Sequence, residues 1–475
     1  MFLKRLARCG RTDERGSALL AVLGVMAVGL ILIALIATSV VGAFGFTSGT
    51  RAGVQSHAAA DAGVVAARTG LYTVGDCVAQ PTPGRYTSTA APVYSATVQY
   101  NAGAGWQPGC PIATTTQVRI VSTGTAQAAG VAGVSSRNTS KVEAVFQYLV
   151  PGPPPSGVAM YLYGGGAFEA NSSLDLSEGG STGLIVKNGD FLCDKNNTVI
   201  NGSILVNGNL TFTNKCSVNG NAWVSGAAAL GSGKIDKNLV AASVTPNPPG
   251  TQVGGTYTPG GAMPSAPGWV DLDYTPTAWL DSSGAAYEVR TVSGAGCVLS
   301  SGTVSGTITG NPVIINALGC VGGPTATNNT TVKLKGDVVI FAKKFDFSGV
   351  NSLIFQSATT AGHRLWFITP DNVADGTPTC QSDQGNFTVK NGFAITAPIA
   401  ALLYTPCAFD GKDGFTWNGQ IYAGKYSFAM NNPSFTFVPV GAAGVNFDAG
   451  DDSVPIVTKP QPGQVVSMRD LNGVG

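Results

Sequence analysis

The sequence predicts a mainly β protein that begins with one long α-helix, continues as a small α+β head, and ends as a parallel right-handed β-helix. Three observations support this fold class. No charged residue occurs between Gly16 and Thr50. Short segments between residues 93 and 148 alternate polar and apolar side chains, as half-buried strands do. Beyond residue 157, glycines recur at intervals of about 6 and about 18 residues, which is typical of stacked coils.

The composition excludes several protein classes. The chain has 475 residues, 11% of them charged, and a formal net charge of +1. A typical soluble domain has about 25% charged residues. This balance excludes a strongly basic nucleic-acid-binding protein. The 64 glycines show no three-residue period, which excludes collagen. The two histidines, His57 and His363, are far apart, so we do not expect a histidine-rich metal site.

The N-terminal region predicts a single membrane span. Residues 1–16 form a basic leader that ends in Arg15-Gly16, and the apolar run over residues 17–46 follows directly. A span needs about 20 apolar residues. The basic flank predicts a cytoplasmic N-terminus and an exported C-terminal bulk. A cleaved secretory signal would have a shorter apolar region, of about 7–15 residues. An uncleaved signal anchor is the other alternative.

The helix is predicted to continue to residue 71, because alanine-rich sequence follows the span and no proline occurs before Pro81. Val54, Ala58, Ala62 and Val65 fall on one helical face, a pattern typical of a helix that packs by that face. Three glycines, Gly42, Gly45 and Gly49, are expected to weaken the middle of this helix.

The N-terminus resembles that of type IV pilins, and more closely that of PilX-type minor pilins. The resemblance rests on Arg15-Gly16-Ser17-Ala18-Leu19-Leu20 and on the later segment Ala59 to Gly63, and it covers about 60 residues. It implies cleavage between Gly16 and Ser17 by a prepilin peptidase. It also implies insertion in the cytoplasmic membrane, followed by extraction of the mature helix into an extracellular filament with other pilin subunits.

One position departs from the pattern of the major pilins. These carry Glu at the fifth mature position, which here is Ala21. In the family, that Glu is thought to pair with the terminal amine of the subunit already in the filament. A subunit at the tip has no predecessor, so Ala21 is compatible with a tip or initiating position.

Residues 72–149 are predicted to form the pilin-like head. Strand candidates lie at residues 93–100, 117–122 and 141–148, where aromatic and β-branched residues alternate with polar ones. We expect three antiparallel strands packed on the end of the long helix. Residues 150–157 form a proline-rich linker that ends the head.

The β-helix is predicted over residues 158–455. Asn-Gly pairs begin at Asn188, Asn201, Asn207 and Asn219, with short apolar pieces between them. About 6 residues per side and about 18 per turn indicate three walls per coil, whose apolar rows are buried by stacking. Asn and Gly are expected to supply left-handed corner conformations. An antiparallel sandwich with Asn-Gly hairpins is the alternative.

The second half of this region continues the same pattern. Residues 245–268 are rich in proline and are predicted to interrupt the coils as an exposed loop, with Trp269 to Trp279 folding back as a flap. Short apolar pieces then resume, and the tail over residues 456–475 is predicted to be irregular. This half resembles, in rhythm only, the bactofilin-like β-helical passengers of some PilX-type proteins.

Eight of the nine cysteines follow the apolar segment, and their even number in an exported chain predicts disulfides. Their spacing favours pairs of neighbours: Cys77 with Cys110, Cys193 with Cys216, Cys297 with Cys320, and Cys380 with Cys407. Free buried thiols are the alternative.

The sequence contains no pattern typical of a serine hydrolase, a zinc protease or a P-loop. Asp448, Asp451 and Asp452 form the best acidic group, and hard oxygen donors of this kind indicate a possible calcium site. No other cofactor is predicted.

The predicted function is therefore that of a minor pilus subunit, at the filament tip, that displays an adhesive or structural β-helix toward a surface glycan or a receptor. It is not expected to be an enzyme. The alternative is a membrane-anchored, glycan-active β-helical enzyme, because lyases and hydrolases with this fold exist.

Overall fold

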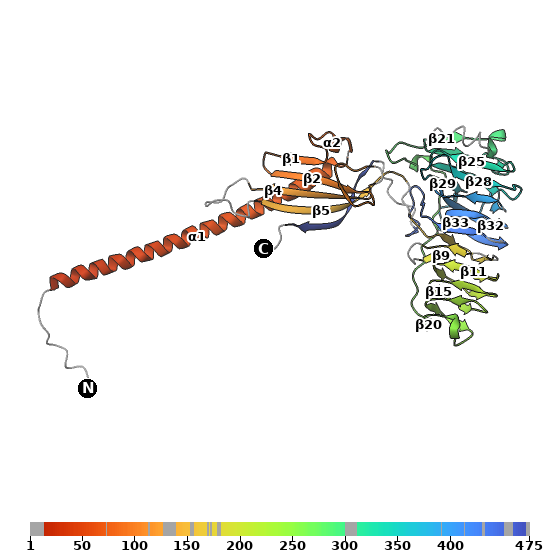
Figure 1. Cartoon of the computed structure of the whole chain (residues 1–475), viewed down its shortest axis with the longest axis horizontal. Coiled ribbons are helices and arrows are strands. Elements are labelled where there is room, and N and C mark those ends of the chain that lie inside the picture. Colours follow the sequence, from red (N-terminus) through yellow and green to blue (C-terminus); the bar gives the residue numbers. More distant parts are fainter. Residues whose placement is uncertain are drawn as a thin grey trace. The chain divides into compact units, whose positions relative to one another are not determined.

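The computed structural model describes residues 14–72, 74–112, 115–126, 139–152, 156–168, 171, 173–177, 182–299, 311–390, 392–412, 414–429, 433–450 and 459–471. The chain divides into two compact units (Figure 1). Unit 1 comprises Met1–Val150 and Lys459–Gly475, and unit 2 comprises Pro151–Thr458. As predicted, the protein is mainly β with one long N-terminal helix.

Unit 1 is a long helix on an antiparallel sheet. Its elements are α1 (Glu14–Gly70), α2 (Val74–Val78), β1 (Arg85–Ser88), β2 (Val93–Asn101), β3 (Trp106–Pro108), β4 (Gln117–Thr125), β5 (Thr139–Leu149) and β35 (Gln461–Asp470). The sheet order is β1-β2-β4-β5-β35, and β3 pairs with β2. The three predicted strands correspond to β2, β4 and β5. Helix α1 continues unbroken through Gly42, Gly45 and Gly49.

The C-terminal tail corrects one prediction. Residues 456–475 were expected to be irregular, but β35 lies antiparallel to β5, with Gln461 opposite Leu149 and Asp470 opposite Val142. The strand has a weak hydrophobic pattern because most of its side chains are exposed, so nothing in its sequence distinguishes it from a loop. Unit 2 is therefore an insertion between two neighbouring strands of unit 1, and not a C-terminal passenger.

A charged group holds β35 to the sheet. Glu143 on β5 is 8% exposed, and its carboxylate accepts a hydrogen bond from Arg469 Nε at 2.8 Å. Arg119 on β4 lies 3.8 Å from the same carboxylate, and its guanidinium stacks 4.7 Å from the ring centre of Trp106. A buried carboxylate without a partner is destabilising, so the two arginines stabilise Glu143 in the sheet. Through its hydrogen bond with Arg469, the same carboxylate fastens β35 to β5.

Unit 2 is a parallel β-helix wound in two halves. The first half contains β6 (Met160–Leu162), β7 (Gly166–Phe168), β8 (Ser173–Asp175), β9 (Thr182–Val186), β10 (Phe191–Cys193), β11 (Thr198–Asn201), β12 (Ser203–Val206), β13 (Leu210–Phe212), β14 (Cys216–Val218), β15 (Ala222–Val224), β16 (Ala227–Ala229), β17 (Lys234–Ile235), β18 (Leu239–Ala241), β19 (Ser243–Thr245), η1 (Gly250–Gln252) and β20 (Tyr257–Pro259).

The second half contains η2 (Pro276–Ala278), β21 (Glu288–Thr291), η3 (Gly294–Cys297), β22 (Val298–Leu299), β23 (Val313–Asn316), β24 (Thr325–Ala326), β25 (Thr330–Leu334), β26 (Val338–Phe341), β27 (Phe345–Asp346), β28 (Leu353–Ser357), β29 (Arg364–Ile368), β30 (Phe387–Val389), β31 (Phe393–Ile395), β32 (Ala400–Lys412), β33 (Thr416–Ala429) and β34 (Ser434–Phe437). The predicted interruption at residues 245–268 begins too early, because β20 still pairs with β18 in the last coil.

The predicted 18-residue coil is confirmed where β11 pairs with β14, β12 with β15 and β13 with β16, whereas the first coil is longer, with Phe191 of β10 beside Gly166 of β7. Asn219 Nδ2 donates to Asn201 Oδ1 at 2.6 Å, 18 residues away. Ala227 N donates to Asn209 Oδ1 at 2.9 Å, again 18 residues away. These corner amides join one coil to the next, so they stabilise the stacking in addition to the parallel strand ladders. The right-handed sense of the winding stays a prediction.

Asn197 and Gly231 do have the predicted positive φ angles, of 63° and 50°, but most glycines of the Asn-Gly pairs serve a different purpose. Gly202 has a positive φ of 143°, but Gly189, Gly208 and Gly220 do not have positive φ angles. A Cβ on Gly208 would lie 2.1 Å from Gly189 O, and one on Gly220 would lie 2.4 Å from Gly202 O. Glycine is required there because the stacked coils approach closely, and not because the corner is left-handed.

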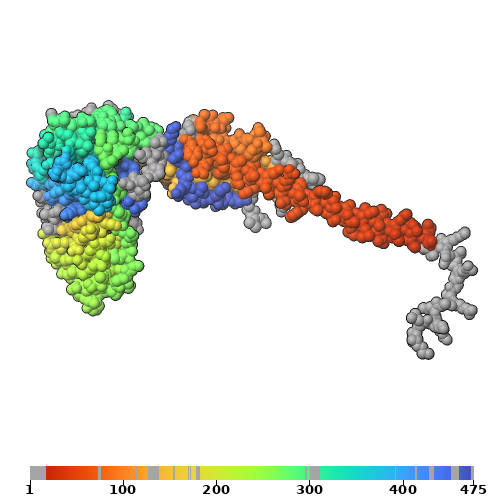
Figure 2. All heavy atoms as spheres, turned by 180° about the vertical axis from the view of Figure 1, so that it is seen from behind, coloured from red at the N-terminus to blue at the C-terminus, as the bar shows by residue number. Residues whose placement is uncertain are grey.

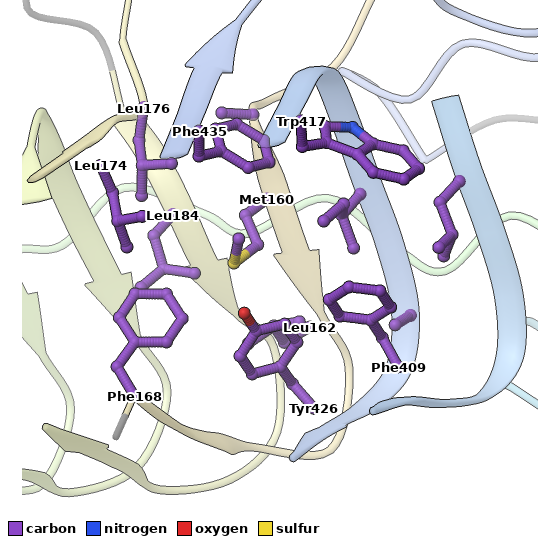
Figure 3. Close-up of a cluster of buried hydrophobic side chains, with 14 of the residues drawn as sticks. Met160, Leu162, Phe168, Leu174, Leu176, Leu184, Phe409, Trp417, Tyr426 and Phe435 are labelled. Atoms are coloured by element: carbon purple, nitrogen blue, oxygen red, sulfur yellow. The ribbon is translucent and has the colours of Figure 1, made fainter. Parts of the chain in front are cut away.

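The two halves meet in the middle of the solenoid (Figure 1). The last coil pairs with the first, because β33 is parallel to β6, with Ile421 beside Met160, and β34 is parallel to β8, with Phe435 beside Leu174. Figure 3 shows the interior at this junction, where Met160 and Leu162 from β6 lie among Trp417, Tyr426 and Phe435 from the last coil. One continuous core therefore runs through both halves.

A crossover segment, residues 260–287, joins the two halves and is called the strap here. As predicted for Trp269 to Trp279, it folds back on the solenoid, and both tryptophans are buried. It covers the outer side of one wall, where Tyr161, Tyr404 and Trp366 point away from the interior. Tyr404 Oη donates to Val270 O at 2.7 Å, and Tyr161 Oη donates to Pro267 O at 3.0 Å. The strap thus contacts both halves.

The described part of the chain contains four disulfides, and they are the pairs favoured by the spacing of the cysteines: Cys77–Cys110 in unit 1, and Cys193–Cys216, Cys297–Cys320 and Cys380–Cys407 in unit 2. Each one joins residues of the same unit.

One buried carboxylate joins the strap to the second half of the solenoid. Asp371 is 1% exposed and accepts hydrogen bonds from Trp269 Nε1 at 3.0 Å and from Thr379 N at 3.1 Å. Burial raises the pKa of this carboxyl group, and the nearby Asp271 adds to the rise. The folded state therefore binds the proton more tightly than the unfolded chain, whose carboxyl pKa is about 3.9.

We predict that the free energy of unfolding of unit 2, taken relative to Asp371→Asn, falls as the pH rises above about 4 and levels off beyond the raised pKa. Asn removes the titration but keeps an oxygen for Trp269 Nε1. The measurement is urea unfolding of both proteins across this pH range. A wild-type protein that gains stability relative to the variant as pH rises would contradict the prediction.

Candidate functional site

The first half of α1 is an uncovered apolar rod. From residue 18 to residue 46 every large apolar side chain is exposed, including Leu20 at 73%, Val25 at 74% and Phe46 at 71%. Figure 2 shows this part of the helix free of the sheet. It is long and apolar enough to cross a membrane, and none of it is buried in the chain.

The polar side chains of this rod are satisfied within the helix. Thr38 Oγ1 donates to Leu35 O at 2.9 Å, and Ser39 Oγ donates to Ile36 O at 2.8 Å. Thr47 makes the same kind of contact with Ala43 O at 2.9 Å. In a bilayer no water is available for such groups, so the internal bonds remove the cost of placing them there.

The predicted processing site lies at the start of α1. Gly16 and Ser17 belong to the first turn of the helix, while residues 1–13 of the leader lie outside the described residues. Ala21, one turn further on, is exposed. The predicted position without a carboxylate is therefore on the uncovered rod, where a neighbouring molecule can reach it.

The second half of α1 packs on the sheet through small residues. Ser56 Oγ lies 2.7 Å from Ser140 Oγ on β5, and both side chains are buried. A Cβ on Gly124 of β4 would lie 2.1 Å from Ala60 N and 2.2 Å from Ser56 O. The helix backbone therefore touches the sheet directly at Gly124. A glycine inside an alternating strand indicates such a close approach, and this sequence signal had been missed.

The buried face of the helix differs from the apolar face seen in the sequence. The residues that face the sheet are Ala52, Ser56, Ala60, Val64, Ala67 and Leu71. In contrast, Val54 is 66% exposed and Val65 is 63% exposed. The stripe of Val54, Ala58, Ala62 and Val65 is thus a second apolar face, which the sheet leaves uncovered. The sequence pattern therefore identified an apolar face of the helix, but not the face that the sheet covers.

The acidic group near the end of unit 2 was a candidate calcium site. Asp448 accepts a hydrogen bond from Gly157 N at 2.9 Å, whereas Asp451 and Asp452 lie outside the described residues. Within the described ranges, no three His, Cys, Asp or Glu side chains are grouped so as to hold a metal ion. Asp448 therefore has a structural contact, and the calcium site stays a prediction.

The sequence matches no family model and no curated protein. Among solved structures, the chain is similar to the competence-associated pilin ComZ from Thermus thermophilus, with 13% identity and a TM-score of 0.26. The alignment covers 88% of this chain and 97% of that chain. This similarity is too low to transfer a function.

The close contact at Gly124 predicts the effect of a single methyl group. Gly124→Ala should destabilise the docking of α1 by about 1–3 kcal/mol, since the clashing atoms belong to the helix backbone and cannot rotate away. The measurement is hydrogen exchange of β4 and β5 in the detergent-solubilised full chain, where faster exchange is expected.

Gly49→Ala is the matched control for this substitution. A Cβ at Gly49, on helix α1, would meet nothing within 4 Å, so hydrogen exchange in the sheet should not change. Equal exchange in the wild type and in Gly124→Ala would show that the helix does not rest on this strand.

Proposed function

We propose that this protein is a minor subunit of a type IV-like pilus, held in the cytoplasmic membrane by residues 17–46 before it is assembled. One observation carries the proposal: an exposed apolar rod continues directly into a helix that is docked on an antiparallel sheet and still presents a second apolar face. This is a pilin-like arrangement. It gives the helix a place in the bilayer first and a place among other helices later.

The energetics support a partner for both apolar faces. Burying one large apolar side chain contributes about 1.5–3 kcal/mol, so a rod with this many exposed side chains is not stable in water. Lipid supplies the partner before assembly. Val54 and Val65 lie beyond the predicted span, beside the sheet, where lipid does not reach in that topology. A neighbouring pilin helix is the partner that fits them.

Two features support a position at the filament tip. Ala21 replaces the carboxylate that the resemblance to pilins implies for internal subunits. Unit 2, over Pro151–Thr458, is also larger than unit 1. A filament interior would have to accommodate such an insertion at every repeat, whereas an end accommodates it once.

We propose that unit 2 acts outside the cell as an adhesive or structural module toward a surface glycan or a receptor, without catalysis. Its disulfides are compatible with an oxidising compartment. Asp448, part of the acidic group near the end of unit 2, accepts a hydrogen bond from the backbone of Gly157.

Processing tests the pilin assignment. The mature protein is expected to begin at Ser17, as determined by N-terminal sequencing. Gly16→Leu should prevent the cleavage, because it changes the residue before the predicted scissile bond. Gly24→Leu is the control, since its Cβ position is open and it lies within the mature helix. A mature protein that begins at Met1 or beyond Phe46 would remove the pilin assignment.

The position in the filament is tested separately. An antibody to unit 2 should label one spot at a filament end. The substitution Ala21→Glu should not improve assembly, because a tip subunit has no preceding subunit with which the carboxylate could pair. A carboxylate without a partner in the bilayer costs about 2.5–3.5 kcal/mol. Labelling at regular intervals along the shaft would refute the tip position while leaving the pilin assignment intact.

A further inference from the structure

The chain enters and leaves unit 2 at one buried side chain. Gln420 on β33 is fully buried. Its Nε2 donates to Ser156 O at 2.8 Å and to Val158 O at 3.1 Å, both in the incoming segment. Its Oε1 accepts from Val440 N at 2.7 Å and from Gly441 N at 2.9 Å, both in the outgoing segment. A glutamine amide has two donor hydrogens and two acceptor positions, so the whole group is used.

Further contacts join the same two segments. Asp448 Oδ1, in the outgoing segment, accepts from Gly157 N at 2.9 Å, and Phe447 N donates to Ser156 Oγ at 3.4 Å. Gly157 has a φ of +89°, and a Cβ there would lie 2.0 Å from the hydroxyl of Tyr422. Glycine is therefore required for the incoming segment to pass so closely. We call the set of Ser156, Gly157, Gln420 and Asp448 the base clamp.

The base clamp is not needed for the winding of the solenoid. The first and last coils are already joined by the backbone ladder between β33 and β6. What the clamp adds is a lateral connection between two segments that are almost 300 residues apart in the sequence. The hydrogen bond that Ser156 accepts from Phe447 N and the one that Gly157 N donates to Asp448 each span 291 residues. Both segments lead to unit 1, because unit 2 is inserted between β5 and β35.

We propose that the base clamp makes the incoming and outgoing segments one cooperative unit, so that tension reaching unit 2 through either connection is shared by both. A segment held alone is released when its own few hydrogen bonds break. Two segments fastened to the same buried amide are released only when the contacts of both break together, which raises the barrier to opening. The inference rests on the insertion topology and holds for any anchored unit 1, whether or not a filament forms.

Hydrogen exchange of the full-length chain in detergent micelles tests this coupling. Among the described residues, the Asp448 side chain accepts a hydrogen bond from Gly157 N on the incoming side, and Asp448→Ala removes it. If the segments form one unit, exchange should rise about tenfold both at residues 156–158 and at residues 440–447, an effect equivalent to about 1.4 kcal/mol. Faster exchange confined to residues 156–158 would overturn the proposal, as would no change in either segment.

Two further variants complete the experiment. Gln420→Leu keeps a similar volume but removes all four hydrogen bonds, so both segments should exchange faster than in Asp448→Ala, while the coils around β20 stay unchanged.

Asn238→Ala is the matched control, because it removes the Asn238 Oδ1 contact to Thr256 N at 2.8 Å in the last coil of the first half. It should raise exchange near β20 and leave the base clamp unaffected. Equal effects of Asn238→Ala at both places would also overturn the proposal.

Discussion

The parallel pairing of the last coil with the first is the constraint on which the rest of unit 2 depends. Because β33 lies beside β6, the chain ends its winding next to the point where it began. This pairing requires the strap, because the chain must run from β20, where the first half ends, to β21, where the second half begins at the opposite end of the solenoid. The strap in turn buries the outer side chains of one wall, which would otherwise be exposed aromatic surface.

The same pairing explains how a solenoid can be inserted into a small sheet. A β-helix wound from one end to the other has its termini a full solenoid length apart. Here both termini lie on neighbouring coils, where Gln420 holds them. They can therefore connect to β5 and β35, which are adjacent strands in the sheet of unit 1. The pair formed by Arg469 and Glu143 then fixes the returning strand in unit 1.

In unit 1, the second half of α1 docks on the sheet by one of its two apolar faces. The face with alanine, serine and glycine permits the helix backbone to touch β4 at Gly124, which gives close packing without large side chains. Val54 and Val65 lie on the other face and stay exposed, whereas Val64 and Leu71 are buried toward the sheet. This arrangement leaves the same helix able to pack against the sheet and against another molecule.

Much of the fold could be read from the sequence because it depends on local patterns. The uncharged run fixes the long apolar helix, strand alternation identifies β2, β4 and β5, and the spacing of glycines gives the coil length. The cysteine spacing agrees with the four disulfides because each pair closes a short loop within one unit. These features depend on residues close together in the chain, where spacing and periodicity determine the structure directly.

The tertiary structure decided what depends on residues far apart. Strand β35 has no local signal, and it exists because Glu143 and the edge of β5 are available to it. The pairing of β33 with β6, the closure by Gln420 and the choice of the small-residue face of α1 all result from partners more than 60 residues away. No periodicity in a single sequence connects positions so far apart, so only the folded chain shows which of these residues contact one another.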